Sequence, residues 1–163
     1  MRTNWLHKIR QKQYSLESLL KEVAAWKAGG ERIVFTNGCF DILHPGHIDY
    51  LAKAATLGDK LIIGLNSDAS VKRLKGETRP LQNQQARMFI LAALAFTDAI
   101  ILFNEDTPYQ LLSQIKPHIL VKGADYKINQ VIGADIVTAN GGSVALLPYL
   151  PGNSTSGIIA RMG

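Results

Sequence analysis

The sequence contains very little cysteine and no long hydrophobic run. Cys39 is the only cysteine among 163 residues, which excludes an internal disulfide and a zinc site made from a cysteine cluster. The most apolar stretch, residues 89–96, is far shorter than the roughly 20 residues that a membrane-spanning helix needs. The opening MRTNWLHKIRQKQ has no apolar segment of the signal-peptide type. We therefore expect a cytoplasmic protein without a membrane partner.

Acidic residues are outnumbered by basic ones. The 18 lysines and arginines against 13 aspartates and glutamates give a formal charge of +5, which suits an anionic partner. Apart from residues 8–12 and 72–79 the basic residues are scattered, and they do not form the aromatic-and-basic pattern of an RNA-binding module. We therefore expect a small phosphorylated ligand rather than a nucleic acid.

Short apolar segments alternate with helical patterns along the chain. Five segments have the length and composition of buried parallel strands; they span residues 33–36, 60–65, 99–103, 118–121 and 143–147. Helical spacing, caps and stops predict helices at residues 15–27, from His44 to Gly58, after Ser67, over 84–96 as a largely buried helix, from Pro108 at a first helical position to Pro117, and from about Ser154.

This alternation predicts an α/β protein. Fully apolar strands separated by helices imply a parallel sheet that is covered on both faces. We expect a Rossmann-like doubly wound parallel sheet of about five strands in a single domain, residues 31–163, preceded by a helical N-terminal lead-in, residues 1–30.

The stretch TNGCFDILHPGHIDYL, residues 36–51, joins the first strand to the next helix. In doubly wound sheets ligands bind beyond the carboxyl ends of the strands, so a glycine-containing turn followed by a helix start suits a phosphate group. His44 and His47 are three residues apart and share one helical face, and Gly46 between them keeps the backbone low. The alternative is that the two histidines are surface or capping residues.

The motif His44-Pro45-Gly46-His47 resembles the HxGH signature of the nucleotidylyltransferase superfamily. GNSTSGIIAR, residues 152–161, resembles its second signature, and VKGADY, residues 121–126, resembles its nucleotide-pocket segment. Together with GLNSDASVKRLKGETRPL, residues 64–81, these motifs are most similar to the D-glycero-β-D-manno-heptose 1-phosphate adenylyltransferases. The resemblance covers nearly the whole chain.

The resemblance implies an enzyme that transfers AMP from ATP to a sugar 1-phosphate, yielding ADP-heptose for the lipopolysaccharide inner core. It implies Mg²⁺ bound with ATP and no dedicated metal ligand from the protein. It also implies a pathway kinase on a separate chain and a homo-oligomeric assembly.

The resemblance also implies site residues. His44 and His47 are the expected catalytic residues. The expected nucleotide-binding residues are Asn37, Gly38, Cys39, Phe40, Asp41, Gly46, Lys122, Ser154, Thr155 and Ser156. The expected residues for the sugar phosphate are Lys75, Arg79, Arg87 and Asp125. Asp41 is equally suited to capping the following helix, and Arg161 is left open between a phosphate contact and solvent.

Three alternatives remain at this point. Cys39 near the histidines allows a Cys–His nucleophile, although its place in a phosphate-type turn argues against it. A cytidylyltransferase for a phosphorylated alcohol such as glycerol 3-phosphate shares the fold, but Tyr149-Leu150 stands where those enzymes generally have Arg-Thr, and residues 95–98 read AFTD rather than RYVD. A non-catalytic nucleotide-binding subunit is the third.

Overall fold

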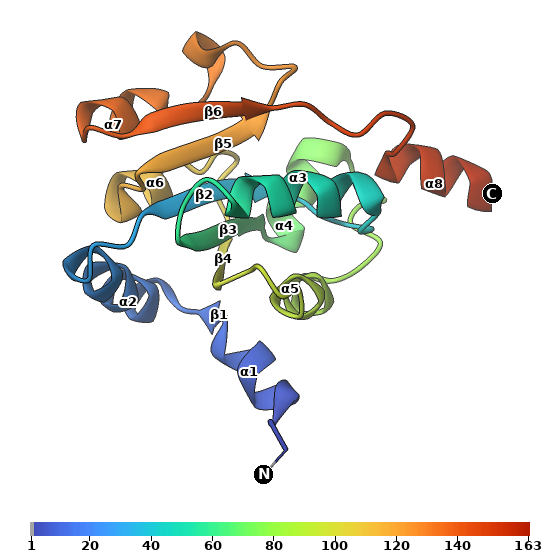
Figure 1. Ribbon diagram of the computed structural model, residues 1–163. Coiled ribbons are helices and arrows are strands. Elements are labelled where there is room, and N and C mark those ends of the chain that lie inside the picture. Colours follow the sequence, from blue (N-terminus) through green and yellow to red (C-terminus); the bar gives the residue numbers. More distant parts are fainter. Residues whose placement is uncertain (1) are drawn as a thin grey trace.

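The computed structural model describes residues 2–163 and has one six-stranded sheet in which all neighbouring strands run parallel. The strand order is β1-β4-β3-β2-β5-β6. The strands are β1 (Gln13–Tyr14), β2 (Ile33–Gly38), β3 (Lys60–Asn66), β4 (Ala99–Phe103), β5 (Ile119–Gly123) and β6 (Ser143–Leu147). The winding therefore starts at β2 and proceeds in opposite directions on its two sides, as Figure 1 shows.

Helices connect the strands. They are α1 (Trp5–Gln11), α2 (Leu16–Ala28), α3 (Pro45–Ala55), α4 (Asp68–Lys75), α5 (Gln84–Ala92), α6 (Tyr109–Ile115), the 3₁₀ turn η1 (Ile128–Gln130), α7 (Ala134–Ala139) and α8 (Thr155–Met162). Within residues 2–163, no helix has both the length and the apolar character needed to cross a bilayer.

The two faces of the sheet build two separate cores. Side chains alternate along a strand, so Ile33 and Phe35 of β2 join one core, while Val34 joins the other. The first core is closed by α2, α6 and α7, and the second by α3 and α5. Strands β2, β3, β4 and β5 are apolar on both faces because helices cover both, which is why the sequence shows continuous apolar runs there rather than alternation.

The predicted α/β, doubly wound parallel sheet is confirmed, but the sheet has six strands instead of about five. The additional strand, β1, lies in the lead-in and pairs with Ile100 and Ile101 of β4. Two residues are too few to show a period in the sequence, and pairing with β4 is what makes them a strand. The lead-in is therefore not purely helical, and Leu19 and Val23 of α2 belong to the first core. Met1 lies outside the described residues.

Two helix predictions need correction. The helix expected over residues 84–96 ends at Ala92, and Phe89 and Ile90 on it are each 38% exposed. Apolar residues all round a helix do not show which side meets solvent, and here only Arg87, Leu91 and Ala92 are buried. Pro108 precedes α6 as its N-cap instead of occupying its first position.

Replacing Leu19 by alanine should lower the free energy of unfolding by about 2–5 kcal/mol, because Leu19 is fully buried and its removal leaves a cavity. Urea denaturation measures the change. The matched control is Leu6→Ala in α1, where the side chain is 57% exposed and the same truncation should change stability by less than about 1 kcal/mol. Equal losses in the two variants would contradict the placement of α2 in the core.

Candidate active site

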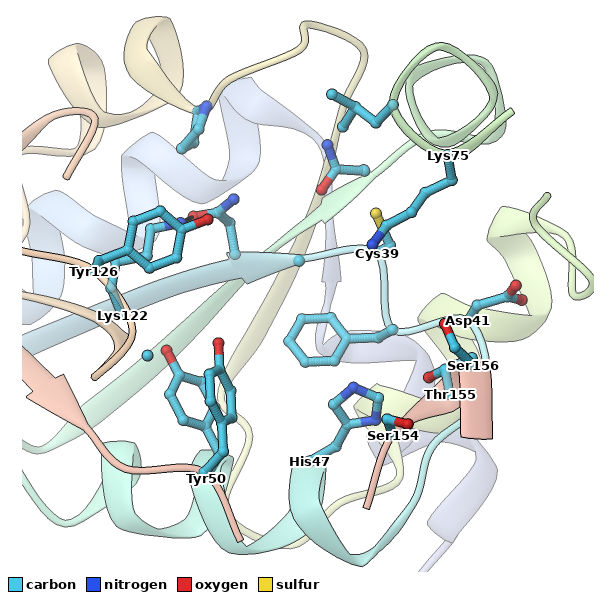
Figure 2. Close-up of a pocket in the computed structure, with 18 of the residues that line it drawn as sticks. Cys39, Asp41, His47, Tyr50, Lys75, Lys122, Tyr126, Ser154, Thr155 and Ser156 are labelled. Atoms are coloured by element: carbon cyan, nitrogen blue, oxygen red, sulfur yellow. Dashed lines mark hydrogen bonds between the residues drawn. The ribbon is translucent and has the colours of Figure 1, made fainter. Parts of the chain in front are cut away.

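A cavity of about 750 Å³ opens at the carboxyl ends of β2 and β5, where the direction of winding reverses. Its size is that of a ligand pocket. It brings together residues from the ends of β2 and β5, the start of α3, the end of α4 and the start of α8. In Figure 2 His47 and Ser154 lie on one side of this cavity, Lys122, Tyr126 and Tyr50 toward another end, and Lys75 above Cys39.

Most of the expected site residues meet in this cavity, although they come from distant parts of the sequence. The lining includes Asn37, Gly38, Cys39, Phe40, Asp41, His44, His47, Lys75, Arg79, Lys122, Ser154, Thr155 and Ser156. Gly46, Arg87 and Asp125 do not line it.

The turn after β2 has a strained centre at Phe40, whose φ is 46°. A non-glycine residue in the left-handed region costs free energy unless its surroundings hold it there. The Phe40 ring packs over Gly38, where an added Cβ would come within 2.8 Å of it, and meets the His47 ring edge-on with 5.2 Å between ring centroids. Gly38 therefore leaves room for Phe40, and Phe40 in turn supports His47.

His44 and His47 form a stacked pair at the start of α3. Their ring centroids are 3.8 Å apart with 21° between the planes. His44 is the N-cap of α3, and its Nδ1 accepts the His47 backbone N–H at 3.4 Å, with Pro45 at the first helical position. Gly46 is buried beneath the His44 ring, where an added Cβ would lie 3.0 Å from it. The capping role and the place in the cavity are therefore both realised in His44.

Both histidines are neutral at pH 7. Burial lowers the pKa of His44. Burial and the neighbouring His44 lower the pKa of His47 to about 4. Because the Nδ1 of neutral His44 accepts a hydrogen bond, its proton sits on Nε2. The pair therefore offers N–H donors to a phosphate, not imidazolium charge.

Asp41 anchors a neighbouring loop instead of capping α3. Its carboxylate accepts from Arg79 Nε at 2.7 Å and from the backbone N–H groups of Leu81 and Gln82. Burial alone would raise the pKa of Asp41, but the hydrogen bonds from Gln82, Leu81 and Arg79 outweigh it and lower the pKa. The expected helix-cap role is wrong because His44 holds that position. Arg79 also lines the cavity.

Arg87 does not contact the cavity, which corrects its assignment to the sugar phosphate. The residue is 1% exposed, and its guanidinium donates to the carbonyls of Gln82, Cys39 and Asn66 and to the Asp68 carboxylate. The sequence placed Arg87 after a basic loop, but helix α5 directs it inward.

Lys122 and Asn37 face each other across the reversal point. Lys122 Nζ on β5 donates to Asn37 Oδ1 on β2, and burial lowers the pKa of Lys122 to about 8. Among residues 2–163 no carboxylate lies within ion-pair distance of this ammonium. A half-buried cation without a carboxylate partner favours an anionic ligand. Asp125, two residues beyond the end of β5, is exposed.

The start of α8 is the second helix terminus at the cavity. Ser154 caps α8 by accepting the Gly157 N–H at 3.0 Å, and Thr155 Oγ1 donates to the carbonyl of Ile42 at 3.2 Å. The second bond ties α8 to the segment that precedes α3. Two helix starts with free N–H groups therefore converge on one space, an arrangement that binds anions. Arg161 is exposed in the last turn of α8 and does not line the cavity.

Two tyrosines at the cavity, Tyr50 and Tyr149, were not predicted, whereas Tyr126 ends the expected pocket segment, residues 121–126. Tyr50 and Tyr149 stack with 5.7 Å between centroids, and Tyr126 lies near them. The hydroxyl of Tyr149 lies so close to Gly123 that an added Cβ there would be 2.2 Å away. Tyr50 follows His47 by three residues on one helix, a spacing that could have shown its shared face. No spacing in the sequence indicated that Tyr149 would lie at the cavity.

The Cys39 thiol has no features of a nucleophile. Burial raises its pKa, and the nearby cationic side chains of Lys75, Arg87 and Arg79 do not overcome this effect. A reactive cysteine needs a lowered pKa, so the Cys–His alternative finds no support in the site.

Comparison with known proteins identifies relatives over most of the chain. A model of the cytidylyltransferase-like family matches residues 35–146. "Bifunctional protein HldE" of Rhodopseudomonas palustris (strain BisA53) is 57% identical over 143 residues, which are 88% of this chain and 29% of that protein. The protein of the same name from Magnetococcus marinus is 50% identical over 159 residues, 98% of this chain and 30% of that protein. The chain thus spans less than a third of the length of these curated relatives.

Two solved structures are similar to this chain, and only the first supports more than the fold. The crystal structure of a lipopolysaccharide core biosynthesis protein from Thermoplasma volcanium has a TM-score of 0.59 and 29% identity, covering 74% of this chain and 98% of that one. A pantoate-beta-alanine ligase from Francisella tularensis has a TM-score of 0.54 with 18% identity, covering 84% of this chain and 67% of that one. The second similarity concerns the fold alone.

The lowered pKa of His47 predicts a pH dependence of stability. Because its pKa is about 4 when folded and about 6.5 in an unfolded chain, the unfolded state binds more protons between these values. The free energy of unfolding should therefore fall as the pH drops from about 6.5 to 4, with His47 contributing up to about 1.4 kcal/mol per pH unit. Urea denaturation at a series of pH values measures the slope. A slope that is unchanged in a His47→Gln variant would contradict the assignment.

Proposed function

The chain belongs to the cytidylyltransferase-like family of nucleotidyltransferases, and from this premise we propose that it transfers AMP from ATP to D-glycero-β-D-manno-heptose 1-phosphate, producing ADP-heptose and pyrophosphate. The family expected from the motifs is confirmed. The observation that carries the proposal is the stacked His44–His47 pair, which shares one cavity with the starts of α3 and α8.

The proposed reaction needs no covalent enzyme intermediate. An oxygen of the sugar 1-phosphate attacks the α-phosphorus of ATP and forms a new P–O bond. The bond from the α-phosphorus to the oxygen that bridges to the β-phosphorus breaks, and pyrophosphate leaves. Catalysis of such a transfer is positioning together with stabilisation of charge on phosphoryl oxygens. Neutral N–H donors on His44 and His47 suit the second task.

Different parts of the cavity suit different parts of the two substrates. The histidines and the α8 start suit the triphosphate. The tyrosine end, with Tyr50 and Tyr149 stacked, suits an aromatic base. Lys75 and Arg79 line another wall and suit the phosphate of the acceptor or the leaving pyrophosphate.

The choice of ATP and of a heptose phosphate rests on similarity. The segment of residues 64–81 resembles heptose 1-phosphate adenylyltransferases, and the curated relatives are bifunctional proteins of one name. A structural relative at 29% identity is a lipopolysaccharide core biosynthesis protein. These points favour ADP-heptose, a precursor of the lipopolysaccharide inner core, over the product of a cytidylyltransferase.

Magnesium would accompany the ATP in this reaction. In residues 2–163 no group of three or more His, Cys, Asp or Glu residues could hold a metal ion, and the Asp41 carboxylate is occupied by Arg79 and two backbone N–H groups. An ion carried by the ATP phosphates would neutralise phosphate charge there, and this Mg²⁺ stays a prediction. The cytoplasmic location, the separate kinase chain and the homo-oligomer stay predictions.

Pyrophosphate release tests the reaction directly. Purified protein is assayed with Mg²⁺ and ATP, CTP or GTP, each with and without heptose 1-phosphate. We expect release only when ATP and the sugar phosphate are both present. Faster release with CTP, or with glycerol 3-phosphate as acceptor, would move the protein to a cytidylyltransferase activity on the same site.

Removal of either active-site imidazole should separate an enzyme from a binding subunit. His44→Ala and His47→Ala are each expected to lower kcat by about 10²–10³, as when one donor to a developing charge is lost. The matched control is His7→Ala at an exposed residue of α1, which should keep full activity. If both active-site variants retain full activity, the non-catalytic alternative becomes the better one.

A further inference from the structure

Arg87 is a fully buried cation whose guanidinium hydrogen-bonds to four different segments of the chain. From helix α5 it reaches the Cys39 carbonyl at 2.6 Å, the Asn66 carbonyl at 2.9 Å and the Asp68 carboxylate at 2.7 Å, while its Nε donates to Gln82. These partners belong to the turn after β2, the end of β3, the start of α4 and the loop before α5. No other side chain donates to the Cys39 carbonyl within residues 2–163.

The contact with Cys39 sets the direction of one peptide group. In a planar trans peptide the C=O and the following N–H point in opposite directions. Because the Cys39 carbonyl points at the buried guanidinium, the Phe40 N–H points away from it, toward the cavity that Cys39 and Phe40 line. Among the described residues no group accepts a hydrogen bond from the Phe40 N–H.

The conformation of Phe40 explains why the turn needs a stabilising hydrogen bond such as the one from Arg87, here called a brace. Its φ of 46° lies in the left-handed region, where a bulky residue stays only if its surroundings hold it. A second brace comes from the other direction, because Asp41 of the same turn accepts from Arg79, Leu81 and Gln82. Gln82 takes part in both braces, since its carbonyl accepts from Arg87.

We propose that Arg87 is a positioning residue, which holds the Cys39–Phe40 peptide so that the Phe40 N–H donates to a phosphoryl oxygen of the nucleotide. The proposal rests on the proposed function for the identity of the ligand. Arg87 acts through the backbone and touches no substrate. The fork of a guanidinium, which contacts three carbonyls and a carboxylate at once, is what lysine cannot reproduce.

The first test uses the wild-type protein. In ¹⁵N–¹H NMR spectra, the Phe40 amide should shift strongly when pyrophosphate or ATP is added, and its exchange with solvent should slow at least tenfold because it gains an acceptor. Adenosine, which lacks phosphates, should leave the Phe40 amide unchanged. A Phe40 amide that responds to none of these, or responds equally to adenosine, overturns the proposal.

The second test compares Arg87→Lys with the Leu19→Ala variant, each assayed at the same number of degrees below its own Tm. We expect Arg87→Lys to weaken ATP binding and lower kcat at least tenfold, with adenosine affinity within twofold of wild type. Leu19→Ala, a core truncation remote from the cavity, should keep wild-type values. Equal behaviour of the two variants would reduce Arg87 to a stability role and overturn the proposal.

The outcomes separate this proposal from the proposed function. If the wild type transfers no AMP, but its Phe40 amide responds to ATP and this response is weakened in Arg87→Lys, the function fails and the positioning role stands. If the wild type transfers AMP but its Phe40 amide signal does not shift with ATP or pyrophosphate, the positioning role fails and the proposed function stands. If Arg87→Lys does not fold, Asp68→Asn, which removes the charged partner of the Arg87 guanidinium, is measured in its place. Wild-type ATP binding and an unchanged Phe40 response in that variant would overturn the proposal.

Discussion

The parallel pairing of β2 with neighbours on both sides is the constraint on which the rest of the structure depends. From β2 the chain winds through β3 and β4 on one side and through β5 and β6 on the other. Crossover helices on the two sides therefore diverge, and a crevice is left above the carboxyl ends of β2 and β5. The turn after β2 enters this crevice, and α3 and α8 begin at it. The ligand site thus follows from strand order before any particular side chain is considered.

Two buried charges, Asp41 and Arg87, and the half-buried Lys122 lie at or next to that crevice, and each is stabilised differently. Asp41 is ionised because Arg79 and two backbone N–H groups compensate its burial. Arg87 is satisfied by three carbonyls and the Asp68 carboxylate. Lys122 has only the neutral Asn37 as a partner. The charges of Asp41 and Arg87 are compensated by neighbouring groups, and both residues stabilise the turn. The positive charge of Lys122 has no negative partner, so an anionic ligand would compensate it.

The histidine pair adds N–H hydrogen-bond donors to these charged residues. Stacking at 3.8 Å disfavours charge on both rings at once, and burial lowers the pKa of each. A site with two neutral imidazoles, two helix starts and a lysine with a pKa of about 8 supplies many N–H donors. Such an arrangement suits a phosphoryl group whose charge is spread over several oxygens.

The sequence alone was enough to predict the parallel α/β fold, the shared helical face of His44 and His47, and the helix start at Ser154. Each of these depends on local features: apolar runs, spacing of three residues between His44 and His47, and a serine before a helix. The sequence could not show that Asp41 faces a loop some forty residues away, that Arg87 turns inward, or that Tyr149 stacks on Tyr50. It also missed β1, whose two residues become a strand only beside β4. These features are decided by which distant segments meet, and a long polar side chain in a linear sequence carries no sign of the partner it will find.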